Sequence, residues 1–213
     1  MDIKEQINKI VFPRDKKCML CEREAIINEH FICSDCADKI IRVYDTQRIL
    51  GISKLRCGLL YDENVKKAVW RFKYEGKAYI AYCLATFMTI GDDWQIDCVV
   101  PVPLHKKREK KRGYNQSMYL AERICEKYEL PLNTNLLTRV KDTTTQTDMT
   151  REERLANIKD AFRTTANVKG ANILLIDDVV TTGSTLEECV KTLKRAGANE
   201  VYALTACTRA TQR

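Results

Sequence analysis

The sequence has no long run of apolar residues and no apolar segment at its start. Its most apolar stretch, residues 78–90, is shorter than the roughly 20 residues that a membrane-spanning helix requires, so we interpret it as a buried helix. Residues 1–9 carry four charged side chains where a secretory signal would have an apolar core. These absences predict a cytoplasmic protein without a membrane span.

The chain also lacks an internal repeat, a Gly-Lys-Ser/Thr phosphate-binding loop and a helix-turn-helix pattern. The second absence excludes a Walker-type nucleotide site, and the third argues against a transcription regulator. The 213 residues are 45% hydrophobic and 31% charged, which allows one or two globular domains with a sizeable core. The net charge of +7 is compatible with binding phosphates or nucleic acid, although surface lysines also serve solubility.

Ten cysteines are present, but only four of them are paired by their spacing. Cys18 and Cys21 form one Cys-x2-Cys hook, and Cys33 and Cys36 form a second hook after eleven intervening residues. Four thiolates in two hooks suit a tetrahedral Zn²⁺ ion, so we predict a structural zinc site. His30 could replace one cysteine, although four already saturate the metal. Two disulfides or a redox pair are the alternatives, and both fit a reduced cytosolic protein poorly.

These patterns divide the chain into two units. Residues 1–52 are rich in cysteine and charge, whereas residues 53–213 alternate apolar runs with segments of helical period. We expect helices over residues 65–73, 78–90, 115–128 and from about 184 to a stop at Gly197, and strands over residues 96–103, 136–140, 173–176 and 201–206. The alternation predicts an α/β fold: a parallel sheet flanked by helices, preceded by a small four-cysteine module.

The most informative segment is Ile-Leu-Leu-Ile-Asp-Asp-Val-Val-Thr-Thr-Gly-Ser-Thr at residues 173–185. An apolar strand ends in Asp177 and Asp178, and a hydroxyl-rich loop then leads into a helix. Carboxylates accept hydrogen bonds from sugar hydroxyls, while loop amides and the helix dipole hold phosphate. The alternative is an ordinary turn capped by Asp178 or Thr182, but adjacent aspartates repel each other unless something compensates. The segment therefore predicts a sugar-phosphate site at the carboxyl end of a sheet.

A second candidate segment is Val-Pro-Val-Pro-Leu-His at residues 100–105. Its two prolines stiffen the backbone and indicate a rigid loop, although they could also simply end the strand. Six of the seven residues in 106–112 are basic, which is usually a solvated loop but here adjoins the proposed phosphate site. Beside this site we expect specific contacts from Arg112, Asn115 and Gln116.

Two further segments carry weaker signals. Residues 139–150 are polar without an apolar period, so they are either a mobile loop that closes over the site or a plain connector. Residues 61–76 mix aromatic and basic side chains. Trp70 could stack on nucleobases, but we favour a place in the core for it. Lys73 is the residue of this segment that we expect to reach a ligand.

The sequence Leu-Ile-Asp-Asp-Val-Val-Thr-Thr-Gly-Ser-Thr at residues 175–185 resembles the signature of type I phosphoribosyltransferases, which bind 5-phosphoribosyl-1-pyrophosphate (PRPP). The resemblance implies a phosphoribosyltransferase-like domain that binds PRPP with Mg²⁺. In it, Asp177 and Asp178 would hold the ribose hydroxyls and, with Arg112, would be catalytic. The residues expected to contact the phosphates are Lys73, Pro103, Leu104, His105, Thr181, Thr182, Gly183, Ser184 and Thr185.

The order of motifs along the whole chain is similar to that of the ComF (ComFC) competence family. A four-cysteine double hook is followed by Lys-Tyr-Glu-Gly, Val-Pro-Val-Pro-Leu-His, Arg-Gly-Tyr-Asn-Gln and the PRPP loop. This resemblance implies a zinc finger at residues 1–52, a phosphoribosyltransferase-like domain at residues 53–213, and a role in DNA uptake during natural transformation. It also implies single-stranded DNA, a ComFA-type helicase and other competence proteins as partners.

The sequence leaves open whether the chain is an enzyme. Purine-salvage relatives have an aspartate near the acceptor base where this sequence has Thr181, and no other residue indicates an acceptor site. The first hypothesis is therefore a PRPP-binding phosphoribosyltransferase-like protein required for DNA uptake. The alternative is a non-enzymatic single-stranded-DNA-binding or scaffold protein that uses PRPP as a regulatory ligand, mildly favoured by the basic run.

Overall fold

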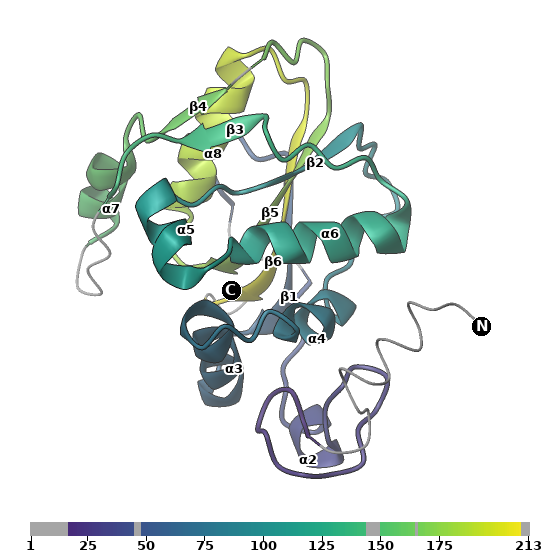
Figure 1. Ribbon diagram of the computed structural model, residues 1–213. Helices are drawn as coiled ribbons and strands as arrows, with labels where there is room; N and C mark the ends of the chain where they lie inside the picture. Colours follow the sequence, from purple (N-terminus) through teal and green to yellow (C-terminus); the bar gives the residue numbers. More distant parts are fainter. Residues whose placement is uncertain (1–16, 45–47, 144–149, 165, 210–213) are drawn as a thin grey trace.

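The structure is a computed structural model that describes residues 17–44, 48–143, 150–164 and 166–209. Its centre is a four-stranded parallel sheet with the strand order β1-β6-β5-β2 (Figure 1). The strands are β1 (Lys54–Leu60), β2 (Cys98–Pro101), β5 (Ile173–Val180) and β6 (Val201–Thr208). The predicted α/β fold with a parallel sheet is confirmed. Strand β1 was not among the expected elements.

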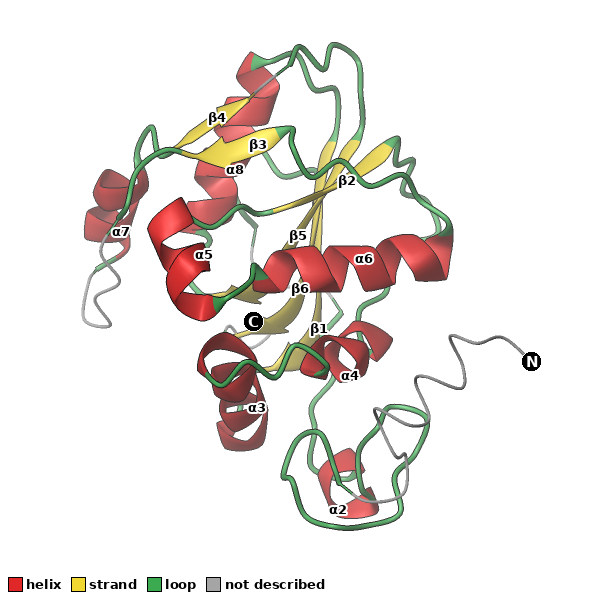
Figure 2. Ribbon diagram, viewed as in Figure 1, coloured by secondary structure: helices red, strands yellow, loops and turns green. Residues whose placement is uncertain are grey.

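Helices cover both faces of this sheet (Figure 2). The helices α3 (Glu63–Tyr74), α4 (Ile80–Thr86) and α6 (Gln116–Tyr128) pack on one face and α8 (Ser184–Arg195) on the other. Two further helices, α5 (Lys106–Arg112) and α7 (Arg151–Ile158), lie toward the end of the sheet (Figure 2). One group of buried residues joins α3, α4 and α6 to alternate residues of β5, and a second group joins α8 to the other residues of that strand. Because side chains alternate along a strand, the apolar run of β5 serves both layers.

Two expected elements differ in detail from the structure. Residues 106–112 were expected to be a solvated loop, but they form α5. The His105 side chain accepts a hydrogen bond from the Lys107 amide at the start of this helix, and Gly113 adopts a left-handed φ of 85° at its end. These caps stabilise a short helix despite its like charges. The expected helix over residues 78–90 is shorter and ends at Thr86.

A second, two-stranded sheet pairs β3 (Leu137–Arg139) antiparallel with β4 (Phe162–Thr164). The strand expected over residues 136–140 is therefore confirmed. Most of the segment interpreted as a closing loop or connector, residues 144–149, lies outside the described residues. Within the described part of the chain, no helix combines the length and apolar character that crossing a membrane would require.

The cysteine hooks of the module lie against α3 and α4 (Figure 1), while residues 41–44 pair with β1. The described residues of the module include the short helix α2 (Ser34–Ala37). Three of its four cysteines, with Met19, Leu20 and Ile32, belong to the same buried cluster as Phe72 of α3 and Ile80 of α4. The module thus shares a core with the larger unit, and the boundary between residues 52 and 53 stays a prediction.

Candidate functional site

A cavity of about 320 Å³ opens at the carboxyl ends of the sheet strands. Most of the sequence-predicted site residues line it: Lys73, Pro103, Leu104, Arg112, Gln116, Asp177, Asp178, Thr181, Thr182, Gly183, Ser184 and Thr185. His105 and Asn115 are not among the lining residues. They cap α5 and α6, with His105 accepting from the Lys107 amide and Asn115 accepting from the Ser117 amide. Chain topology thus brings three separate sequence segments into one strand-end cavity.

The two aspartates at the end of β5 have different partners. Asp178 is buried, and its carboxylate lies 2.8 Å from the Lys73 ammonium of α3. Asp177 accepts hydrogen bonds from the Ser117 hydroxyl of α6 and from the Asp178 amide, both at 2.9 Å. These contacts compensate the repulsion between adjacent carboxylates, so the pair is held in place by α3 and α6.

The environment of the site raises the pKa values of Asp177 and of Lys73. Burial, reinforced by the neighbouring Asp178 charge, raises the pKa of Asp177 to about 7. Burial opposes the charge of Lys73, but the contact with Asp178 outweighs it and raises the pKa of the Lys73 ammonium. Near neutral pH the site therefore holds one ion pair beside a second carboxyl group that is partly protonated.

The loop over residues 181–185 leads directly into the first turn of α8. Gly183 has a φ of 80°, and a Cβ added there would lie 2.5 Å from the Ile49 side chain, so glycine is required at this turn. The Thr182 and Ser184 hydroxyls are hydrogen-bonded to each other at 2.9 Å. The first amides of α8 have no partner within the helix, and together with the helix dipole they suit an anion.

Helix α5 forms a basic wall of the cavity. Arg108 and Arg112 line it, because residues four apart share one face of a helix. The four lysines of α5 are exposed and are not among the lining residues, so only two of the six cations meet the cavity. Arg112 donates to the Gln116 side chain at 3.0 Å and lies 5.1 Å from the centre of the Tyr74 ring.

Several further residues of the cavity were not predicted as site residues, among them Tyr61, Ser117, Arg139 and Arg209. Arg139 ends β3, and burial lowers the pKa of its guanidinium. Its Nε is buried without a hydrogen-bond partner among the described residues. Tyr61 and Arg209 directly follow β1 and β6, so the rule that sites form at strand ends could have found them. Nothing in the local sequence indicates Ser117, and Arg139 was expected only as the first residue of the segment 139–150, interpreted as a closing loop or a connector.

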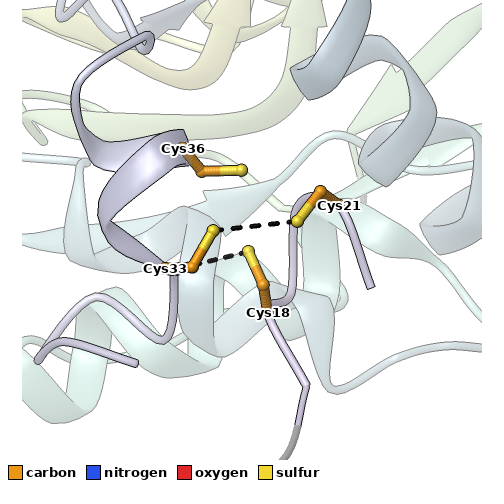
Figure 3. Close-up of side chains that lie close together, drawn as sticks. All are labelled: Cys18, Cys21, Cys33 and Cys36. Atoms are coloured by element: carbon orange, nitrogen blue, oxygen red, sulfur yellow. Dashed lines mark hydrogen bonds between the residues drawn. The ribbon is translucent and has the colours of Figure 1, made fainter. Parts of the chain in front are cut away.

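The four cysteines of the double hook point toward one another (Figure 3). Their sulfur atoms all lie within 4.8 Å of one another, and Cys21 Sγ is 3.8 Å from Cys33 Sγ. Zinc–sulfur bonds of about 2.3 Å in a tetrahedron place the sulfurs about 3.8 Å apart, so the cluster fits this ion. The Cys33 amide also donates to Cys18 Sγ at 3.4 Å, the type of contact that orients a metal ligand.

The prediction for Trp70 is wrong. Trp70 is 52% exposed and Tyr74 is 57% exposed, and their rings lie 5.8 Å apart on the outer face of α3. Phe72, between them in sequence, is fully buried. The helical period places residues 70 and 74 on one face and residue 72 on the opposite face, which favours solvent for the two outer aromatics.

Comparison with known proteins agrees with this geometry. Residues 111–213 match the family model described as "Phosphoribosyl transferase domain". This range contains α6, the aspartate pair and the loop that opens α8. A parallel sheet with helices on both faces and a strand-end cavity completes the description, so the chain has a phosphoribosyltransferase-type fold preceded by a four-cysteine cluster.

Three curated relatives identify the family. The DNA utilization protein YhgH of Salmonella typhimurium is 38% identical over 89% of this chain and 96% of its own. Competence protein ComFC of Bacillus subtilis is 33% identical over 84% of this chain and 72% of its own. Competence protein F of Haemophilus influenzae is 32% identical over 66% of each chain. The chain belongs to the ComF (ComFC) competence family.

Proposed function

We propose that this protein binds PRPP with Mg²⁺ in the strand-end cavity and serves the handling of DNA in natural transformation. The observation that carries the proposal is the aspartate pair placed beside the loop at residues 181–185, within one cavity. The names of the relatives, which refer to competence and to DNA utilization, support the cellular role. A cytoplasmic location, a ComFA-type helicase and other competence proteins remain part of this proposal.

Each wall of the cavity suits one part of PRPP. The amides of residues 181–185 and the first turn of α8 would bind the 5-phosphate. Asp177 and Asp178 would accept hydrogen bonds from the ribose hydroxyls. Arg108 and Arg112 of α5 would offset the charge of the pyrophosphate. Lys73, paired with Asp178 in the structure, lies where it would hold this carboxylate in its charged form.

As chemistry, the cavity would support displacement at the ribose C1. The bond between C1 and the pyrophosphate oxygen breaks, its electron pair leaves on pyrophosphate, and an acceptor forms the new bond. Bound Mg²⁺ would supply further positive charge for the leaving group. The residues of this chain would orient the ribose and stabilise the departing anion, whose charge develops in the transition state.

Calorimetric titration with PRPP and Mg²⁺ tests the binding. We expect saturable binding to the full chain and a loss of at least about tenfold in affinity for the double variant Asp177→Asn and Asp178→Asn, which removes two charged hydrogen-bond acceptors. Asp92→Asn is a matched control because Asp92 is exposed and distant in sequence from the cavity residues. Equal binding by the double variant and the control would refute the proposed site. Release of pyrophosphate with an acceptor would identify an enzyme.

A second function, binding of single-stranded DNA, is favoured by the exposed aromatics of α3. Trp70 and Tyr74 offer two ring faces, and Arg112 links them to the basic helix α5. Stacking on such rings with cations alongside is a common mode of binding single strands. Binding of a labelled oligothymidylate should weaken steeply with salt and drop about tenfold in Trp70→Ala. Lys39→Ala is the control variant, because Lys39 is an exposed lysine of the cysteine module. Trp94→Ala is unsuitable as a control, because Trp94 is buried.

A further inference from the structure

An acidic residue, Asp142, lies beside the basic wall of the cavity. It is three residues beyond β3, and its Oδ1 lies 3.6 Å from Arg108 Nε and 3.6 Å from His105 Nδ1. Arg108 lines the cavity, as do Arg139 and Thr143 of the segment that carries Asp142. The carboxylate therefore stands among the cations that the proposed function assigns to pyrophosphate.

Contacts of the neighbouring residues hold Asp142 in this place. The Val140 amide and the Lys141 ammonium each donate to a carbonyl of the segment that follows α7, both at 2.8 Å. On the other side, Thr143 is buried and its hydroxyl accepts a hydrogen bond from Arg139. The chain around Asp142 is thus positioned by contacts that do not involve its own carboxylate.

The carboxylate meets a local excess of positive charge. Burial and the neighbouring Arg108 charge lower the pKa of the Arg139 guanidinium, whereas the charges of Asp177 and Asp142 raise it. Like charges in a partly buried site repel each other unless a counter-charge lies close by. Asp142 supplies part of this counter-charge from within the chain.

The two arginines of the basic wall have different partners. Arg112 donates to the neutral Gln116 side chain and lies beside the Tyr74 ring, so its charge is available to an incoming anion. Arg108 instead faces Asp142, and this carboxylate already compensates part of its charge. An anion that binds Arg108 must therefore displace the carboxylate or share the guanidinium with it.

We propose that Asp142 is a built-in competitor of pyrophosphate: its carboxylate occupies Arg108 in the free protein and is displaced when a diphosphate group binds. This inference rests on the proposed function, because it takes the place of the pyrophosphate from that proposal. A phosphate bound by the loop that opens α8 does not require the displacement. Asp142 thereby determines how strongly the cavity holds a diphosphate compared with a monophosphate.

Calorimetry with inorganic pyrophosphate and with ribose 5-phosphate separates the two ends of the site. Both titrations are made without Mg²⁺ and at low ionic strength, because salt screens partly exposed charges. Asp142→Asn should bind pyrophosphate about threefold more tightly than wild type, which is the size expected for the loss of a partly exposed ion pair. Its affinity for ribose 5-phosphate should stay unchanged.

Asp160→Asn is the matched control. The Asp160 side chain is 43% exposed, against 39% for Asp142, and it pairs at 3.8 Å with Arg195, at the opposite end of α8 from the cavity. Asparagine also tolerates the left-handed φ of 55° at this position. The control removes the same charge and should leave the affinities for both ligands at their wild-type values.

A double-variant cycle tests whether the effect passes through Arg108. In an Arg108→Gln background the guanidinium is absent, so Asp142 has no cation to withhold from the ligand. Adding Asp142→Asn to this background should therefore leave pyrophosphate affinity unchanged, although Arg108→Gln itself weakens binding.

The outcomes that would overturn the inference are distinguishable from a failure of the proposed function. Asp142 is no competitor for Arg108 if Asp142→Asn binds pyrophosphate no more tightly than wild type, gains no more than Asp160→Asn, or gains equally in the Arg108→Gln background. In these cases the PRPP site stands. If neither PRPP nor pyrophosphate binds to the wild-type chain, the proposed function fails, and this inference fails with it.

Discussion

At the scale of single residues, the site depends on two adjacent aspartates with different partners. Asp178 contacts the Lys73 ammonium, whereas Asp177 accepts a hydrogen bond from the Ser117 hydroxyl. Burial, reinforced by the neighbouring Asp178 carboxylate, raises the pKa of Asp177 to about 7, which makes the stability of the protein depend on pH.

The first prediction concerns Asp177→Asn. The pKa of Asp177 rises from its ordinary value of 3.8 to about 7 in the folded protein. Between these values the folded chain holds a proton that the unfolded chain has lost, so this group makes the free energy of unfolding fall as pH rises. Relative to wild type, the asparagine variant should therefore gain stability from pH 5 to pH 7 and no more above pH 8. Urea unfolding at each pH measures this difference, and a difference independent of pH would contradict it.

The sequence predicted those site residues whose positions are determined by a single local pattern. Asp177, Asp178 and Gly183 belong to one strand–loop–helix segment, and their positions follow from it. Ser117 and Arg139 reach the cavity only through the packing of α6 and β3, which no local pattern records. Trp70 was wrongly placed because aromatic character was given more weight than the helical period.

At the scale of elements, α3 joins the cysteine module to the cavity. Its residue Arg71 is buried and donates to the carbonyls of Met19 at 2.9 Å and Leu20 at 2.6 Å, within the first cysteine hook. Arg71 also forms an ion pair with Glu22 at 2.6 Å. Two residues further along the same helix, Lys73 holds Asp178. One helix thus contacts both the proposed metal site and the proposed ligand site.

The second prediction is that Arg71→Met destabilises the protein by about 3 kcal/mol, because it leaves two buried carbonyls without their donor and removes one of the two cations paired with Glu22. Urea unfolding measures this change. Lys67→Met is the matched control, since Lys67 is an exposed residue of the same helix and should change stability little. Equal effects of the two substitutions would show that Arg71 does not fix the module to α3.

The basic helix α5 shows why a helix can be missed when only the sequence is considered. A run of basic residues is usually a solvated loop, and residues 106–112 were interpreted in this way from the sequence. The caps at His105 and Gly113 and the position of Arg112 against Tyr74 outweigh the repulsion between these like charges. In the sequence, Gly113 marks a possible end of a helix. The contact between Arg112 and Tyr74, in contrast, depends on the position of α3 in the fold.

At the scale of the whole molecule, the sequence predicted the fold class and most strands of the sheet. It did not predict β1, whose seven residues include a glycine and two basic side chains and lack clean alternation. The strand forms because it pairs with β6 at the other end of the chain, with Lys54 opposite Tyr202 and Leu60 opposite Thr208. Pairing over such a distance in sequence is a property of the assembled sheet.

The third prediction follows from the core that the cysteine module shares with α3 and α4. Removal of the zinc ion that we propose for this site should lower the melting temperature of the whole chain, since the module cannot unfold without exposing that core. Calorimetric scans with and without a strong chelator should show one transition that moves to lower temperature. A main transition that stays in place while a separate small one disappears would show that the module unfolds independently.

The fourth prediction tests the central claim, that an aspartate pair and the loop opening α8 hold one PRPP molecule. A crystal structure of the chain with PRPP and Mg²⁺ measures this most directly. We expect the 5-phosphate against the amides of residues 181–185, the ribose hydroxyls on Asp177 and Asp178, and the pyrophosphate toward Arg108 and Arg112. A cavity without the ligand at saturating PRPP, or a ligand whose ribose makes no contact with either aspartate, would contradict the account.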